Sequence, residues 1–470
     1  MKTTYGRVIP KNLRAYKEAL NTIRMHLERR IIALQKKCKP LAFEDGIKRL
    51  PDEIVACIFE CGQQATDDNK FALNVSHVCR RFREIAFGAS QLWARFHPEM
   101  IHPEAVSFLE SKSKQGGIEV FMSSHGDYTK DQQDQYRLID VANRHIDRWT
   151  HLRMDGLIHM DDLFCETTPV LPRLRSIEHN NRFHNEYACP YEKWDMPNLS
   201  LFVGINVVPV FRVDCNISSL ELILKGRSEL NEYFHTSYLV DTLATLPRLR
   251  SLSLEFQATQ CDEIRSSTAS LPDLELLNIT IKYSTDYTLI KSFISSVSFP
   301  NLSQLEILLE EICGEYSADG FLNEILPPFS AVHPRVHTVR IYTSHKFYIG
   351  LLQRVFDSVP SVRHLVIDAP NTALLWGNEF FVSAALYNRW PPLQTLRIKR
   401  STRLSERQME ALVDKIHFDG NWDVFQSLQI VSCVGLSEGF LLYMESKMDG
   451  KLEWTNVVAA VDEPSENDFD

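Results

Sequence analysis

The sequence predicts an α/β fold in which helical segments come first and an irregular, parallel-stranded solenoid fills the rest of the chain. Three observations lead to this prediction. The 470 residues exceed the usual size of one compact core. The N-terminal part carries apolar side chains at helical spacing. Further along, a template of one proline and three leucine-type residues recurs, and its alternating apolar positions are typical of strands.

We expect one long, basic amphipathic helix in residues 1–40. From Lys11 to Lys39 there are nine basic residues against Glu18 and Glu28, and we expect Pro40 to end the helix. Apart from Arg30, the seam at a/d spacing is apolar: Leu13, Tyr16, Leu20, Ile23, Leu27 and Leu34. This seam permits a self-associating coiled coil. The interpretation that we favour is that it packs on the helices that follow.

A small all-α domain is expected in residues 43–96. Pro51 suits the first turn of a helix because it has no N–H to leave unpaired, and Asp52 and Glu53 favour the positive end of the helix dipole. Gly62 is suited to end this helix. A second helix is expected in residues 75–86, and Leu-Trp closes the domain. Three arginines of the second helix are expected in solvent: Arg80, Arg81 and Arg83.

The order of these motifs resembles an F-box, in particular the F-box-like form of the expanded families of mushroom-forming (basidiomycete) fungi. The resemblance rests on Leu-Pro-x-Glu-Ile from Leu50, on Val-Ser-x-Val-Cys-Arg-x-Phe-Arg-x-Ile-Ala from Val75, and on the closing Leu-Trp. Phe82 stands where the family often has Trp, and residues 88–90 lack a frequent Pro. The resemblance implies a surface for a Skp-family adaptor: Leu50, Pro51, Ile54, Ile58, Val78, Cys79, Leu92 and Trp93. The alternative is an ordinary helical hairpin that has no adaptor surface.

Residues 97–147 are expected to hold linking helices and the first strand. Pro103 to Lys112 predicts a short helix, Ile118 to Met122 a strand, and the spacing from Tyr136 to Ile146 another helix. A further strand is expected at Trp149 to Met154. The same succession follows the F-box in the fungal families, so the resemblance extends to about residue 155.

Residues 148–456 repeat the template Pro-x-Leu-x-x-Leu-x-Leu. From Pro247 to Pro391 its copies are 25 to 34 residues apart, which is the period of leucine-rich repeats. Strong copies begin at Pro172, Pro247, Pro272, Pro300, Pro334, Pro360 and Pro391, and weaker ones at Pro197, Ile217 and Phe425. Helical patterns run between the strands, so we expect a parallel sheet on the concave face of a solenoid. The repeats lack the Asn that many such repeats place after the strand, which predicts an irregular solenoid.

Residues between the leucines of each strand should point into the curve of the solenoid. These positions run from acidic to basic: Glu178, Glu221, Ser253, Glu255, Asn278, Thr280 and Glu306, then Arg340, Tyr342, His364, Asp368, Arg397 and Lys399. We expect a target protein to bind there through Glu221, Glu255, Arg340, Tyr342, His364, Arg397 and Lys399. The alternative is a solvated face whose charge is uneven.

No catalytic motif and no cofactor site is predicted. Cys57 and Cys61 lie one helical turn apart, but we expect at least one of them in the helical core rather than on a metal. The ten cysteines in general are expected as reduced, buried thiols. His179, His184 and Glu186 are expected in a solvated loop. The net charge of −10 argues against nucleic acid as a partner, and no segment predicts a membrane span or signal peptide. Residues 457–470 predict a disordered acidic tail.

The sequence therefore predicts a non-catalytic protein of the cytoplasm and/or nucleus. The preferred function is substrate recognition in an SCF-type cullin-RING E3 ubiquitin ligase. The F-box would bind the Skp-family adaptor, and through it the cullin, while the repeats hold an unknown target protein. One alternative is a scaffold that pairs with the adaptor but delivers nothing for degradation. Another is an enzyme whose site lies in the repeats.

Overall fold

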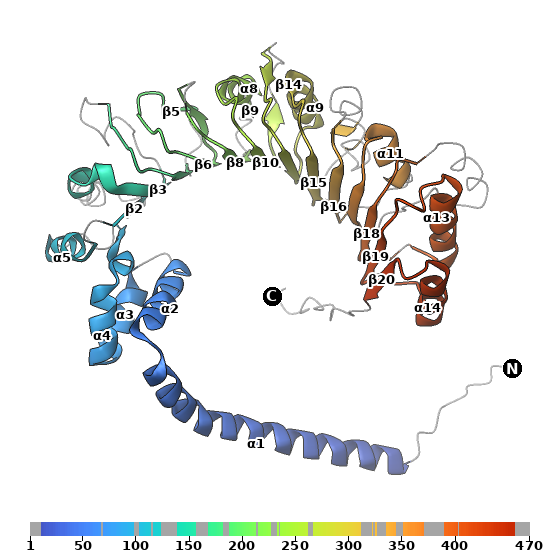
Figure 1. The fold of residues 1–470 in the computed structure, drawn as a ribbon, viewed down its shortest axis with the longest axis horizontal. Helices are drawn as coiled ribbons and strands as arrows, with labels where there is room; N and C mark the ends of the chain where they lie inside the picture. Colours follow the sequence, from blue (N-terminus) through green and yellow to red (C-terminus); the bar gives the residue numbers. More distant parts are fainter. Residues whose placement is uncertain are drawn as a thin grey trace, which may run out of the picture. The chain divides into compact units, whose positions relative to one another are not determined.

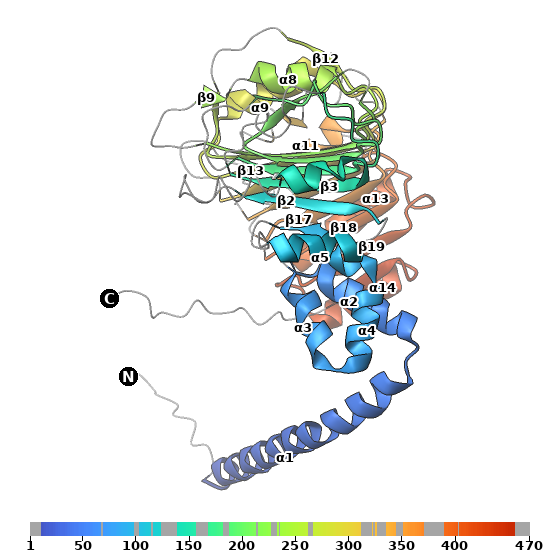
Figure 2. The same ribbon diagram turned by 90° about the vertical axis from the view of Figure 1, so that its left-hand side faces the viewer.

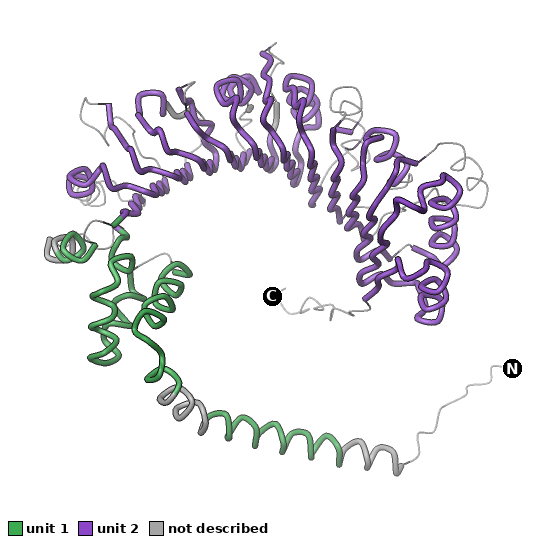
Figure 3. Tube along the Cα trace, viewed as in Figure 1, with its two compact units in different colours: residues 1–95, 108–116 green, residues 96–107, 117–470 purple. Residues whose placement is uncertain are grey.

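The computed structural model describes residues 11–66, 69–97, 103–113, 116–123, 139–156, 168–181, 188–212, 215–226, 233–234, 236–261, 267–311, 322, 325–326, 335–344, 351–370, 390–402 and 404–455. The chain divides into two compact units (Figure 3). Unit 1 comprises residues 1–95 and 108–116, and unit 2 comprises residues 96–107 and 117–470. The expected acidic tail at 457–470 lies outside the described residues. None of the described helices combines the length and apolarity that crossing a bilayer needs.

Unit 1 consists of helices. They are α1 (Lys11–Arg49), α2 (Asp52–Gln64), α3 (Lys70–Val78), α4 (Arg80–Gly88) and the 3₁₀ helix η1 (Ser90–Trp93), while α5 (Pro103–Ser113) spans the boundary between the units. The prediction that Pro40 ends the first helix is wrong, because helical backbone continues through it to Arg49. The preferred packing of the α1 seam is also wrong over residues 19–36, where every side chain is exposed.

The expected second helix of this unit is in fact two helices. The backbone of Cys79 is extended, with φ −158° and ψ 171°, so it separates α3 from α4. Its Sγ accepts a hydrogen bond from the Phe82 N–H at 3.5 Å and caps α4. Sulfur is a weak acceptor, and cysteine is not among the usual N-cap residues. The break therefore carries no ordinary sequence signal.

Gly62 does not end α2, which continues to Gln64. Its function is packing: a Cβ built on Gly62 would lie 2.2 Å from Cζ of Phe71, far inside van der Waals contact. The ring of Phe71 thus lies directly on the backbone of α2. Only glycine permits this approach, and it joins α2 to α3.

Unit 2 is built on the 14-stranded sheet of the described chain, in which every neighbouring pair of strands from β2 to β20 is parallel. In spatial order the strands are β1 (Arg95–Phe96), β2 (Ile118–Ser123), β3 (Trp149–Asp155), β4 (Ser176–Asn180), β6 (Leu201–Ile205), β8 (Ser219–Lys225), β10 (Ser251–Gln257), β13 (Leu276–Lys282), β15 (Gln304–Glu310), β16 (Thr338–Thr343), β17 (His364–Asp368), β18 (Thr395–Lys399), β19 (Ser427–Val431) and β20 (Leu452–Thr455). The expected parallel sheet is confirmed.

Helices and short strands cover the convex side of this sheet. The helical pieces are η3 (Ile146–Arg148), α8 (Thr236–Ala244), α9 (Tyr287–Ser296), α11 (Leu351–Ser358), α13 (Glu406–Phe418) and α14 (Glu438–Lys447). Short parallel pairs join β5 (Ala188–Pro190) to β7 (Val208–Val210), β9 (Tyr233–Phe234) to β11 (Gln260–Cys261), and β12 (Ala269–Ser270) to β14 (Val297–Ser298). Within unit 2 the long strands line the inside of the curve and the helices its outside (Figures 1 and 2).

The leucines of the template form the core between these layers. On β10 to β16, Leu254, Ile279, Ile307 and Ile341 are paired in register and fully buried. One unit cannot cover these side chains alone, so burial of each column depends on the neighbouring units. This dependence explains why the template recurs at a nearly constant phase.

Asparagine hydrogen bonds precede two of the strands, and residues with left-handed backbone follow several of them. Asn198 and Asn301, at the second template position, donate through Nδ2 to the carbonyl oxygens of Pro172 and Pro272 in the preceding unit, at 2.6 and 2.7 Å. After the strands, left-handed residues turn the chain outward: Asn206, Ala258, Tyr283, Glu311, Arg400 and Ser432. Asn206 is buried, and its Oδ1 accepts from the Lys225 N–H at 2.7 Å. The sequence analysis expected no Asn after the strands of the repeats. At least this unit has one.

His179 contradicts the expected solvated loop, whereas His184 and Glu186 lie outside the described residues. It belongs to β4 and is only 2 % exposed. Its Nδ1 lies 2.7 Å from Oη of Tyr191, a buried ring that also contacts Trp194 and Phe202. Burial lowers the pKa of His179 from 6.5 to about 4, so the imidazole is neutral at pH 7.

Replacing His179 by Asn should flatten the dependence of stability on pH. The unfolded chain protonates this histidine below pH 6.5, whereas the folded chain resists protonation until about pH 4. The native protein therefore loses stability as the pH falls through this window, by roughly 3 kcal/mol from this group. Urea unfolding of both proteins between pH 4 and 7 measures the difference. Parallel curves for the two proteins would contradict the prediction.

Candidate functional site

The core of unit 1 is aromatic. Val55 and Phe59 are the buried apolar side chains of α2, and the ring of Phe59 meets Phe82 edge-on with centroids 5.0 Å apart. Trp93 is fully buried, and its Nε1 donates to the carbonyl oxygen of Ala86 at 2.8 Å. Its ring also packs edge-on against Phe108, with centroids 5.0 Å apart. These contacts fix α2, α4 and η1 against one another.

Arg81 holds the start of α2, although the sequence placed its side chain in solvent. From α4 its Nη1 donates to the carbonyl oxygen of Ile47 at 2.9 Å, and its Nη2 donates to that of Leu50. Its Nε and Nη2 also bind Oδ1 of Asp52, at 2.9 and 2.6 Å. One guanidinium thus satisfies carbonyls at the end of α1 and the carboxylate that begins α2. Arg81 occupies an unspecified position of the motif, so the sequence carried no signal for this role.

An apolar stripe remains uncovered on α2. Ile54 is 47 % exposed and Ile58 is 51 % exposed, and Cys57 and Cys61 are exposed beside them. The spacing i, i+3, i+4, i+7 places all four on one helix face. At the junction of α3 and α4, Val78 is 65 % exposed. An apolar face of this kind on a folded domain marks a surface for a protein partner.

The residues that carry this face coincide with a known domain. The model of the F-box-like family matches residues 47–99 of the chain. This segment is an F-box-like domain. It begins three residues before Leu50 and includes the whole stripe of α2, the Cys79 junction and η1. A search of curated proteins found no match to the chain.

The F-box-like domain separates the predicted adaptor residues into two groups. Exposed or half-buried are Leu50, Pro51, Ile54, Ile58, Val78 and Cys79. Leu92 and Trp93 are fully buried instead, so direct contact with a partner does not fit their position. The expectation that Cys57 or Cys61 belongs to the core is also wrong, since both thiols are exposed and free. Among described residues no group of three His, Cys, Asp or Glu side chains is arranged to hold a metal ion.

The concave side of unit 2 presents a second candidate surface. Register pairing aligns the predicted positions in rows, so that Glu221, Ser253, Asn278, Glu306 and Arg340 follow one another across five strands. The next row along the strands includes Glu255, Thr280, Leu308, Tyr342, Asp368 and Lys399. Apolar side chains such as Leu308 and Val366 are half-buried within these rows. The face is thus a patterned surface of charge and apolar contact.

Ion pairs neutralise part of the charge that was expected to run from acidic to basic. Arg340 pairs with Glu306 across β15 and β16, and Arg400 with Asp368 at 2.6 Å. Lys282 lies 3.2 Å from Glu255 and 3.3 Å from Glu310. Desolvation would lower the pKa of Lys282, but the hydrogen bonds and charges of these two carboxylates raise it. Two of the predicted binding residues, Glu255 and Arg340, are therefore already engaged in ion pairs within the sheet.

The remaining predicted residues are more accessible. Glu221 and Arg397 are exposed, Tyr342 and Lys399 are half-buried, and the described chain offers Arg397 and Lys399 no ion-pair partner. Nδ1 of His364 lies 3.0 Å from the hydroxyl oxygen of Thr395. Burial, followed by the charges of His337 and Arg363, lowers the pKa of His364.

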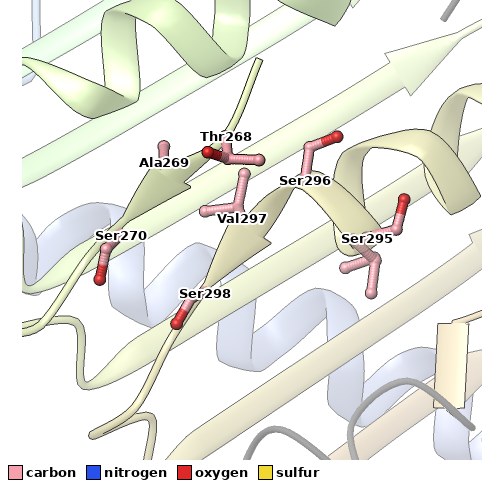
Figure 4. Close-up of a pocket in the computed structure, with 8 residues that line it drawn as sticks. Thr268, Ala269, Ser270, Ser295, Ser296, Val297 and Ser298 are labelled. Atoms are coloured by element: carbon pink, nitrogen blue, oxygen red, sulfur yellow. The ribbon is translucent and has the colours of Figure 1, made fainter. Parts of the chain in front are cut away.

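A pocket of about 620 Å³ lies on the outer layer, away from the concave strands (Figure 4). Residues 268–270 and 294–298 line it, from β12, the end of α9 and β14. Among the described residues, the lining contains hydroxyls, such as those of Ser270 and Ser298, and no charged side chain. A hydroxyl nucleophile needs an adjacent base, and the described lining supplies none.

Proposed function

We propose that the chain is a substrate-recognition subunit of an SCF-type cullin-RING E3 ubiquitin ligase. The F-box-like domain binds a Skp-family adaptor and, through it, the cullin. The strand units of unit 2 are irregular leucine-rich repeats that hold a target protein on their concave side. Ubiquitin transfer belongs to other subunits, and this chain contributes proximity by binding one protein at each end.

One observation carries the proposal: Ile54 and Ile58 are exposed on the domain that matches the F-box-like family, while Val55 and Phe59 are buried behind them. Folding alone does not require two large aliphatic side chains in water on the same helix face. The period of 25 to 34 residues and the parallel register of the strands support the repeat assignment.

Reconstitution tests the proposal. The full-length chain is mixed with a Skp-family adaptor, a cullin, a RING subunit and ubiquitin-loaded E2, together with the proteins that it captures from cell extract. The expected result is a stable complex with adaptor and cullin and ubiquitination of a captured protein. A stable complex that leaves all captured proteins unmodified would favour a non-degradative scaffold. Failure to bind any Skp-family adaptor would refute the proposal.

The target is expected to place acidic groups near Arg397 and Lys399 of β18. Both cations lie on the concave side, without an ion-pair partner in the described chain, and Arg397 is exposed. Reversing both to Glu should weaken target capture about tenfold or more, since like charges at an interface repel. Quantitative mass spectrometry of the captured proteins measures the loss, and adaptor capture should not change.

The matched control reverses Lys291 on α9 and Arg407 on α13 to Glu. These side chains are exposed on the helices of the outer layer, so the net charge changes equally while the concave side stays intact. Target capture should persist in this variant. If both double variants capture the same proteins as the native chain, the concave assignment is refuted.

A further inference from the structure

Helix α1 carries an apolar seam that is open to solvent. Five side chains between 53 % and 67 % exposed compose it: Leu20, Ile23, Leu27, Ile31 and Leu34. Their spacing of three, four, four and three residues places them within about 80° of the helix circumference. The a/d pattern of the sequence is interrupted at Arg30. In the structure the neighbouring Ile31 lies in line with the other four side chains, so the exposed seam has no interruption. The seam is continuous and as narrow as a coiled-coil contact.

Basic residues flank the seam on both sides. At 100° per residue, Arg24 lies beside one edge and Arg30 beside the other. Arg24 lies 3.6 Å from Glu28 in a pair that is more than half exposed, and such pairs exchange easily with other partners. Arg30 has no partner in the described chain. Both edges of the seam therefore present positive charge to whatever covers it.

We propose that this seam binds an amphipathic helix of an acidic partner protein, with Glu or Asp beside its own apolar stripe. Charges at the edges of a helix pair determine which partner is accepted. In a pair of two copies of this chain, Arg24 and Arg30 of one copy would lie close to the arginines of the other. The repulsion between these positive charges disfavours self-association. The narrow stripe fits one helix better than a bilayer, which needs a broader apolar face. The assignment does not depend on the F-box-like domain or on a ubiquitin ligase.

Two synthetic helices test the proposal with the full-length chain. Both are about 28 residues long, with Leu and Ile at the seam positions; one has Glu at the flanking positions and the other has Lys. Fluorescence anisotropy measures binding to the labelled peptides. The Glu peptide should bind at least about tenfold more tightly than the Lys peptide, and the difference should shrink as salt is added.

Variants separate the seam from its flanks. Replacing Leu27 and Ile31 by Ser should abolish binding of the Glu peptide. Reversing Arg24 and Arg30 to Glu should exchange the preference, so that the Lys peptide binds better. The control reverses Arg29 and Lys36, which lie on the side of α1 away from the seam, and should keep the original preference. All these positions are exposed, so the substitutions remove no buried contact.

Three results would overturn the proposal. One is equal binding of the two peptides. Another is a dimer in analytical ultracentrifugation that the Leu27 and Ile31 variant loses, since a second copy would then cover the seam. The third is binding to vesicles of anionic lipid with no binding to either peptide. A variant with Ile54 and Ile58 replaced by Asp should still bind the Glu peptide, which keeps this test separate from adaptor binding.

Discussion

Replacing Ile54 and Ile58 together by Asp is expected to abolish binding of the chain to a Skp-family adaptor. Both side chains are about half exposed in the free domain, so a partner can cover what remains open. Covering the exposed half of each isoleucine contributes about 1 kcal/mol, and burying a carboxylate in its place costs more. The affinity should fall by at least about 100-fold. Co-purification of the adaptor with the native and variant chains measures the loss.

The same helix supplies two controls for this experiment. Gln64→Asp adds a carboxylate at an exposed position at the C-terminal edge of the stripe, one turn after Cys61, and it should weaken adaptor binding far less than the double variant does. Val55→Asp places the charge on the buried side, where the domain should unfold instead. The double variant should keep the helical content of the native domain. If it also retains the adaptor, the stripe of α2 is not the adaptor surface.

The division of α2 into a buried and an exposed side was only partly predictable. The sequence shows two apolar stripes, one with Ile54 and Ile58 and one with Val55 and Phe59. Periodicity gives the angle between stripes but not which of them the other helices cover. The resemblance to the F-box assigned the exposed stripe. The direction of Arg81 escaped prediction because it depends on contacts across helices. The cap at Cys79 escaped prediction because cysteine is not among the usual N-cap residues.

The strands of unit 2 were predictable in more detail, because each burial column repeats. Leu254, Ile279 and Ile307 are equivalent in the template and paired in the structure. The charged side chains of the concave side were predicted one strand at a time. That approach missed the ion pairs that form between neighbouring strands. Arg340 and Glu306 lie 34 residues apart in the chain yet face each other across one strand spacing. Sheet register, which local pattern does not give, decides which charges remain available.

Trp93→Ala is expected to unfold the F-box-like domain and to lose the adaptor only as a consequence. Trp93 is fully buried, donates to the carbonyl oxygen of Ala86 and packs against Phe87 and Phe108. Truncating such a side chain costs about 3 to 5 kcal/mol, enough to open a small domain. Hydrogen exchange should show lost protection in α2 and α4. Amides of β10 to β19 should keep theirs, because they belong to the other unit.

Trp93→Phe distinguishes support of the fold from direct contact. Phenylalanine keeps much of the aromatic packing and gives up the hydrogen bond to Ala86, so it should cost about 1 to 3 kcal/mol. Protection in α2 should largely persist, and the adaptor should still bind. If Trp93→Ala instead loses the adaptor while every amide of α2 and α4 stays protected, the indole contacts the adaptor itself. Binding would then require the domain to open around η1, because the ring is inaccessible in this structure.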